Sequence, residues 1–279
     1  SFDSVKDYLA PYLKDFERRF RNSMTSKVPL LDTIMTYIVK RKGKQIRPMF
    51  VLLSADLFAD INERSFRGAS LVELLHTATL VHDDVVDEAS TRRWVDTVHS
   101  RFDARVAVLA GDFLFAQASW HLANLDDLEV VKLLSRVIMD LADGEVKQGL
   151  FRYDTDQSFE TYLEKSYCKT ASLIANSSRA AGVLSGCKEA ELDALYNFGR
   201  QLGLAFQVVD DILDFTGSEK KLGKPAASDL ATGYLTAPCF YAMEDHPELK
   251  GLIQTQFRQP GDLDRALEMV RSSKAIPRT

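Results

Sequence analysis

Residues 66–87 read FRGASLVELLHTATLVHDDVVD and decide the fold. Apolar side chains occupy most sides of the helix that this stretch predicts, which is typical of a buried helix rather than a surface one. Its polar end carries Asp83, Asp84 and Asp87. Because a helix turns by about 100° per residue, Asp83 and Asp87 share one face and Asp84 flanks it.

Helical periodicity extends over most of the 279 residues, while Gly (14) and Pro (8) are sparse. No series of short alternating strands occurs, so the sequence predicts an all-α protein. With 46% hydrophobic residues and no polar linker, residues 1–279 are expected to form a single domain of about ten or more helices. The expected helices are 5–21, 29–39, 49–58, 66–87, 104–124, 128–150, 159–184 and 190–215, with shorter ones after residue 233.

Composition excludes several classes of protein. A formal net charge of −5 argues against a nucleic-acid partner. The three cysteines have neither metal-ligand spacing nor an even count, so we expect no zinc site, no disulfide framework and a reducing compartment. No apolar run approaches the roughly 20 residues that span a bilayer, and we expect neither a transmembrane segment nor a targeting segment in this chain.

A second aspartate cluster, in the stretch VVDDILD at 208–214, consists of Asp210, Asp211 and Asp214. One such motif among 40 acidic residues is equally well explained as a solvated acidic face, but two copies in apolar surroundings are not. Carboxylates bunched near an apolar interior repel one another unless a cation compensates, which predicts hard divalent ions, most naturally Mg²⁺. Mg²⁺ is normally held by a few carboxylates together with phosphate oxygens, so the pair of clusters predicts a diphosphate substrate.

A leaving diphosphate also needs positive charge from the protein. Candidate groups are Arg92 and Arg93 after the first cluster, Lys169 midway along the chain, and Lys224 after the second cluster. Each alone would be read as a solvated surface cation. The nearness of Arg92 and Arg93 to Asp87 favours a role in stabilising the leaving group, and Lys169 gains weight only from the set of motifs as a whole.

These motifs together resemble the trans-polyprenyl diphosphate synthases. The resemblance rests on GKQIRP at 43–48, His76, DDVVD at 83–87 with Arg92-Arg93, Lys169-Thr170, and QVVDDILD at 207–214. They follow in the family's order as far as about residue 233, and the stretch from Asp211 to Lys224 is similar to long-chain members of the octaprenyl or solanesyl type. The resemblance implies the isoprenoid-synthase fold around a central cavity, a homodimer, and Mg²⁺, with three ions when substrate is bound.

The resemblance also implies a role for each matched residue. It assigns the diphosphate of the incoming isopentenyl unit to Gly43, Lys44, Arg47, His76 and Arg93, although a lone histidine such as His76 is otherwise more often a satisfied core residue. It assigns the allylic diphosphate to Arg92, Lys169, Thr170, Gln207 and Lys224, together with the metal ligands Asp83, Asp84, Asp87, Asp210, Asp211 and Asp214. The implied reaction ionises the allylic diphosphate, condenses it with isopentenyl diphosphate and eliminates a proton, and it requires no protein nucleophile.

Product length is expected to depend on the helix that precedes Asp83. Ala78 and Thr79 lie about one and a half turns upstream, where short-chain relatives carry aromatic residues, and both are small. Leu75 and Leu71 could form a deeper floor, although each is as well explained by ordinary helix packing. The pattern predicts a long-chain product, which Ala78→Phe should shorten.

Two features depart from the family pattern. Trp94 follows Arg93 where a glycine is usual, and the chain ends at Thr279, before the last C-terminal helices of typical members. The alternatives are a class I terpene cyclase, whose second metal motif is usually a mixed Asn/Ser/Glu pattern, and a non-catalytic subunit of a heteromeric synthase. The expected compartment is the cytoplasm or the plastid stroma, with peripheral membrane contact for release of an apolar product.

Overall fold

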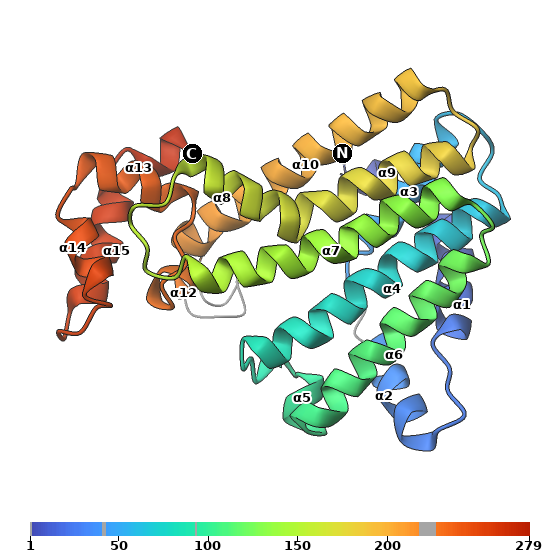
Figure 1. Cartoon of the computed structure of the whole chain (residues 1–279), viewed down its shortest axis with the longest axis horizontal. Helices are drawn as coiled ribbons and strands as arrows, with labels where there is room; N and C mark the ends of the chain where they lie inside the picture. Colours follow the sequence, from blue (N-terminus) through green and yellow to red (C-terminus); the bar gives the residue numbers. More distant parts are fainter. Residues whose placement is uncertain (1, 41–42, 93, 218–226) are drawn as a thin grey trace. The chain divides into compact units, whose positions relative to one another are not determined.

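The computed structural model is almost entirely helical and describes residues 2–40, 43–92, 94–217 and 227–279 (Figure 1). Helix α8, the π-helical turn η1 and helix α9 run on as one helix, and counted in this way the described residues form 14 helices, ten of them at least seven residues long. The prediction of an all-α protein is therefore confirmed. The described strands are β1 (Thr91–Arg92) and β2 (Val95–Asp96), which pair as an antiparallel hairpin.

The helices follow the predicted segments closely, and 128–150 agrees with α7 at both ends. Their bounds are α1 Phe2–Ser23, α2 Pro29–Val39, α3 Ile46–Asp56, α4 Glu63–Val86, α5 Val98–Arg101, α6 Ala104–Ala123, α7 Leu128–Leu150, α8 Phe159–Ser166, η1 Tyr167–Ala171, α9 Ser172–Leu184, α10 Glu189–Thr216, α12 Ser228–Ala231, α13 Ala237–Asp245, α14 Leu249–Gln254, α15 Asp262–Ser272 and α16 Ala275–Arg278.

The chain divides into two compact units by its internal contacts. The first unit comprises Ser1–Arg136 and Leu173–Asn197, and the second comprises Val137–Ser172 and Phe198–Thr279. A single domain over residues 1–279 stays a prediction.

Helix α4 lies at the centre of the first unit. It packs against α1, α3 and α6, and Figure 1 shows α4 and α6 running side by side. Leu71, Leu74 and Leu75 of α4 are at most 1% exposed, as the apolar sequence predicts for a buried helix. Gly111 of α6 allows α6 and α4 to approach each other closely, because a Cβ atom at this position would lie 2.1 Å from Nε2 of His82 on α4.

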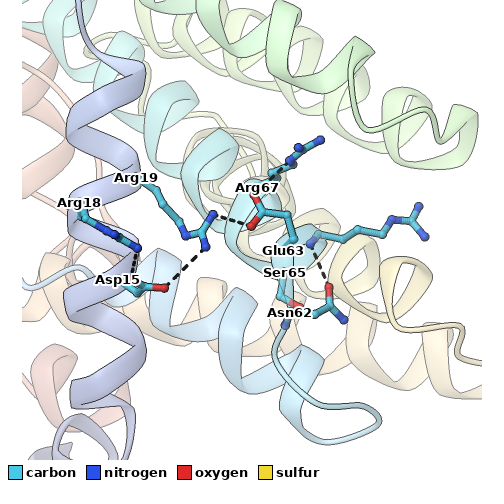
Figure 2. A network of polar contacts seen from close by, with 8 residues as sticks. Asp15, Arg18, Arg19, Asn62, Glu63, Ser65 and Arg67 are labelled. Carbon is cyan, nitrogen blue, oxygen red and sulfur yellow. Dashed lines mark hydrogen bonds and ion pairs between the residues drawn. The ribbon is translucent and has the colours of Figure 1, made fainter.

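The N-terminal end of α4 is fixed by hydrogen bonds from both its own residues and α1 (Figure 2). The Asn62 side chain accepts from the backbone amide of Arg64, and the Ser65 hydroxyl accepts from the Asn62 amide, which closes a capping box. Arg19 of α1 donates to Glu63 at 2.6 Å. This partly exposed ion pair contributes about 1 kcal/mol or less, but it ties α1 to the first turn of α4.

The second unit has its core among the C-terminal helices. Phe215, Leu230, Leu235, Leu249 and Ile253 are at most 1% exposed and belong to one apolar cluster. Phe215 directly follows the second aspartate cluster, so the end of α10 is anchored in this core. The carbonyl oxygen of Phe215 also accepts from Nε of Arg271 on α15.

One described helix, α6, is long and apolar enough to cross a membrane by length and composition alone, contrary to the expectation that no apolar run approaches that length. It packs along α4, and a third of its most apolar window is buried. Leu109 and Trp120 remain exposed, at 57% and 68%.

Candidate active site

Both aspartate clusters lie at the C-terminal end of a long helix. Asp83 and Asp84 are in the last turn of α4 and Asp87 is its C-cap residue, while Asp210, Asp211 and Asp214 lie in the last two turns of α10. The backbone dipole places partial negative charge at a helix C-terminus and disfavours carboxylates there. A cation bound at either helix end would relieve this repulsion.

In the first cluster the middle aspartate is held by the protein. Asp84 is only 4% exposed, whereas Asp83 is half-buried and Asp87 is exposed. Nε of Arg92 donates to Oδ1 of Asp84 at 2.7 Å, because the hairpin after α4 returns β1 to the helix end. The structure thus brings Arg92, predicted to stabilise the leaving group, into direct contact with the predicted metal cluster.

Trp94 occupies the turn between β1 and β2. Its φ is 66° and its side chain is 69% exposed. This left-handed conformation costs a residue with a side chain about 1 kcal/mol or more, and glycine far less. The geometry therefore suits the glycine that the resemblance places here. Arg93 lies outside the described residues.

Arg47 and His76, both predicted to hold the isopentenyl diphosphate, lie together in the first unit. Nη1 of Arg47 on α3 is 2.9 Å from Nε2 of His76 on α4, and both side chains are half-buried. A guanidinium can only donate, so His76 accepts through Nε2 and is neutral in this arrangement. Lys44 is exposed and Gly43 half-buried, just before α3.

In the second cluster, Asp211 has a donor on each carboxylate oxygen. Tyr162 of α8 donates its hydroxyl to Oδ2 at 2.6 Å, and Nε2 of Gln207 donates to Oδ1 at 2.8 Å. The Thr170 hydroxyl in turn donates to Oε1 of Gln207 at 2.7 Å. The predicted residues Thr170, Gln207 and Asp211 therefore form one hydrogen-bonded chain.

Burial dominates the electrostatics around Asp211, which is 2% exposed. It raises the pKa of Asp211 to about 6, although the hydrogen bonds from Tyr162 and Gln207 act in the opposite direction. Burial likewise lowers the pKa of Lys165, which lies on α8 one turn after Tyr162. The negative charge of Asp211 acts in the opposite direction and raises the pKa of Lys165. Because burial disfavours the charged carboxylate, a positive group close to Asp211 would stabilise its ionised form and counteract the rise in pKa.

Asp214, also buried, is engaged with the start of α12. Its carboxylate oxygens lie 3.4 Å from the Ser228 hydroxyl and 3.3 Å from the Asp229 amide, and its backbone carbonyl accepts from the Ala227 amide at 2.8 Å. These contacts give Asp214 a structural part, and its role as a metal ligand stays a prediction. Asp210 is exposed. Lys224 lies outside the described residues.

Lys169 and Thr170 lie on η1, a π-helical turn within a segment that the periodicity predicts as one regular helix. Two glycines of the second unit let their helices approach this turn closely. A Cβ on Gly203 of α10 would lie 2.5 Å from Cα of Ala171, and one on Gly144 of α7 would lie 2.8 Å from Cγ of Lys169. π-turns of this kind are frequent at functional sites.

Sequence reasoning missed three side chains at this site. Nζ of Lys169 lies 2.6 Å from Oε1 of Glu145 and 2.9 Å from Oε1 of Gln148, both on α7. Glu145 and Gln148 are three residues apart on α7, but nothing in the sequence links them to Lys169. Tyr162, the third, lies 49 residues from Asp211.

The four predicted chain-length residues lie along one side of α4 and differ in burial. Ala78, Leu75 and Leu71 are at most 1% exposed and belong to its fully buried face. Thr79 is half-buried and lies one turn from both Leu75 and Asp83, so it continues this side of the helix toward Asp83. Of the four, Thr79 is the best placed to meet a chain that leaves from Asp83.

The donor set suits Mg²⁺ rather than a metal enclosed by protein. Among the described residues, no group of three or more His, Cys, Asp or Glu side chains is close enough to hold a metal ion by itself. Mg²⁺ is usually bound by one or two carboxylates together with substrate phosphates and water. Carboxylates such as Asp83 and Asp87, one turn apart at a helix C-terminus, fit that mode.

Comparisons with known proteins identify the family of this chain. The family pattern described as polyprenyl synthetase matches residues 28–270. A prenyl transferase of Synechocystis sp. is 57% identical over 254 residues, which cover 90% of this chain and 79% of that protein. The chloroplastic solanesyl diphosphate synthase 2 of Arabidopsis thaliana is 44% identical, covering 99% of this chain and 68% of that protein.

A solved structure shows the same fold. The polyprenyl synthase of Caulobacter crescentus, crystallised with calcium and isoprenyl diphosphate, is 32% identical, has a TM-score of 0.93, and is matched over 100% of this chain and 86% of its own. These likenesses place the protein among the prenyltransferases. It belongs to the polyprenyl synthetase family, which confirms the resemblance.

Proposed function

We propose that this protein condenses isopentenyl diphosphate with an allylic diphosphate and repeats the step to give a long-chain all-trans polyprenyl diphosphate. The observation that carries the proposal is the family match over residues 28–270, combined with two aspartate clusters whose buried middle members are each held by protein donors. Cyanobacterial and chloroplastic relatives support a place in the cytoplasm or plastid stroma. Peripheral membrane contact during release of the apolar product is a further part of the proposal.

The chemistry needs charge stabilisation rather than a nucleophilic side chain. Bound Mg²⁺ supplies positive charge to the leaving diphosphate while the allylic C–O bond breaks. Arg92 and Lys169 add fixed cationic groups, each next to acidic side chains of its own unit. The isopentenyl double bond then attacks the allylic carbocation, and the product loses a proton to the released diphosphate.

The Lys169 side chain is held in place by neighbouring residues of α7. Its ammonium group is paired with Glu145 and Gln148, so it is held in one orientation before substrate arrives. A diphosphate carries more negative charge than a single carboxylate and would draw the same ammonium toward the substrate. Thr170 and Gln207 serve the same substrate through the hydrogen-bonded chain to Asp211, and Lys224 completes the proposed set.

The second substrate needs its own cationic site. Arg47 brings a positively charged guanidinium for the anion, and His76 orients that group by accepting from its Nη1 at 2.9 Å. Lys44, the Gly43 backbone and Arg93 are the remaining proposed contacts to the isopentenyl diphosphate.

Incubation with labelled isopentenyl diphosphate, Mg²⁺ and a panel of allylic primers tests the proposal. The expected product is a ladder of polyprenyl diphosphates, and Asp83→Asn should reduce its formation by roughly 100-fold or more, as removal of a group that stabilises the transition state does. Asp126→Asn, in an exposed loop, is the matched control and should leave the rate unchanged. Cyclic hydrocarbons formed without use of isopentenyl diphosphate would instead indicate a cyclase. A chain that is inactive alone and restores a partner's activity would be a non-catalytic subunit.

Thr79→Phe should shorten the product while turnover is retained. The aromatic ring would project from the face of α4 that carries Asp83 and would block the growing chain one turn from the aspartate. Ala78→Phe is the less direct test, because Ala78 is 0% exposed and a ring there would also overpack the core. Mass analysis of the products measures their chain length. An unchanged product ladder from Thr79→Phe would rule out a role of Thr79 in setting that length.

A homodimer is part of the proposal. Leu109, Ala116 and Trp120 of α6 are exposed and lie within about 40° of one another around the helix, which makes an apolar outer face suited to a second copy. Sedimentation at micromolar concentration should give a dimer, and Leu109→Glu should convert it to monomer. A wild-type protein that sediments as a monomer would contradict this assembly.

A further inference from the structure

Tyr162 is a buried side chain to which the resemblance gives no role. It lies on α8, is 1% exposed, and places its hydroxyl oxygen 2.6 Å from Oδ2 of Asp211. A phenol at neutral pH is a donor to a carboxylate, so the hydroxyl proton points at Asp211. This pair connects two elements, α8 and α10, within the second unit.

The two donors to Asp211 are not interchangeable. Gln207 lies one turn before Asp211 on the same helix, and its amide orientation is set by the Thr170 hydroxyl at Oε1. Tyr162 approaches the other oxygen from a different helix. With Gln207 as its only donor, the Asp211 carboxylate could still rotate about the one oxygen that is held. With Gln207 and Tyr162 each donating to a different oxygen, the plane of the Asp211 carboxylate is fixed.

The Tyr162 ring is held by packing, so its hydroxyl is aimed before any ligand binds. Its centroid lies 5.3 Å from that of Phe159 and 5.7 Å from that of Phe240. The Lys165 ammonium lies over the ring face at 5.8 Å. A side chain locked in this way can orient a neighbour with little loss of conformational entropy at the time of binding.

A carboxylate has about four lone-pair positions, and Tyr162 and Gln207 use one on each oxygen. The remaining positions of Asp211 are those that a divalent cation, or a water bound to it, would use. Loss of a group that orients a metal ligand in this manner typically weakens metal affinity by about 10- to 100-fold.

We propose that Tyr162 is a positioning residue of the second aspartate cluster: its hydroxyl fixes the carboxylate plane of Asp211 and thereby sets the affinity of this cluster for the divalent cation. The inference rests on the proposed function, because it assumes that Asp211 faces the cation that accompanies the allylic diphosphate. The isopentenyl diphosphate contacts of the first unit do not depend on it.

The experiment compares wild type, Tyr162→Phe, Asp211→Asn and the double variant. Tyr162→Phe removes one oxygen and keeps the ring. The first readout is Mn²⁺ binding, measured by electron paramagnetic resonance in the presence of a non-reactive allylic thiolodiphosphate. The second is the Mg²⁺ concentration that gives half-maximal activity. Tyr241→Phe is the matched control, since Tyr241 contacts Phe159 in the same aromatic cluster.

Tyr162→Phe should weaken Mn²⁺ binding and raise the half-saturating Mg²⁺ concentration by about tenfold, with the KM for isopentenyl diphosphate within about twofold of wild type. In the Asp211→Asn background the same change should alter Mn²⁺ affinity by less than about twofold, because the partner of the hydroxyl is already altered. Tyr241→Phe should behave as wild type.

Three results would overturn the inference: unchanged metal affinity in Tyr162→Phe, an equal loss in both backgrounds, or loss of cooperative thermal unfolding, which would make Tyr162 a core residue only. The Mn²⁺ measurement needs no turnover. A wild-type chain that makes no product would refute the proposed function, while a tenfold loss of Mn²⁺ affinity in Tyr162→Phe would still support the positioning role.

Discussion

The need to satisfy the buried middle carboxylate of each aspartate cluster, Asp84 and Asp211, is the constraint on which the rest of the structure depends. They are 4% and 2% exposed, and a buried carboxylate is strongly destabilising unless it is paired or hydrogen-bonded. The hairpin after α4 meets this need for Asp84 by returning Arg92, and α8 meets it for Asp211 by presenting Tyr162. The elements around each cluster are therefore those that supply its donors.

This arrangement separates two roles within each cluster. The middle aspartates are fixed by the protein, while Asp87 and Asp210 reach solvent at the ends of α4 and α10. Because both clusters lie at helix C-termini, the backbone dipole adds to the repulsion among the carboxylates. A cation that also binds a diphosphate relieves that repulsion and links the metal to the substrate, which is the usual mode of Mg²⁺ in phosphate chemistry.

The sequence predicts most of the fold because helical periodicity is a local signal. The ends of α7, and the outer limits of the segment formed by α8, η1 and α9, agree with the predicted ranges. The π-turn at Tyr167–Ala171 escaped prediction because the apolar spacing continues through it, and its close neighbours Gly144 and Gly203 are 23 or more residues away in the chain.

The candidate site, like the fold, was predicted only where the signal is local in the sequence. Asp84 and Arg92 are eight residues apart, and the prediction that Arg92 acts beside the first cluster followed from that nearness. Tyr162 and Glu145 form pairs that only the folded chain creates, so a buried tyrosine and a helical glutamate carry no local mark of their partners. Charged residues and their spacing can be recognised in a sequence. The hydrogen-bond donors that orient a buried carboxylate cannot, when they come from distant parts of the chain.

Each helix end is expected to take up a divalent cation much more tightly when a diphosphate is present than when it is absent. Calorimetric titration of Mg²⁺ into the protein, with and without a non-reactive allylic thiolodiphosphate, measures this coupling directly. The analogue should tighten Mg²⁺ binding by a factor between about 5 and 150, the usual span of coupling between two ligands. Mg²⁺ binding of equal affinity with and without the analogue would contradict this expectation.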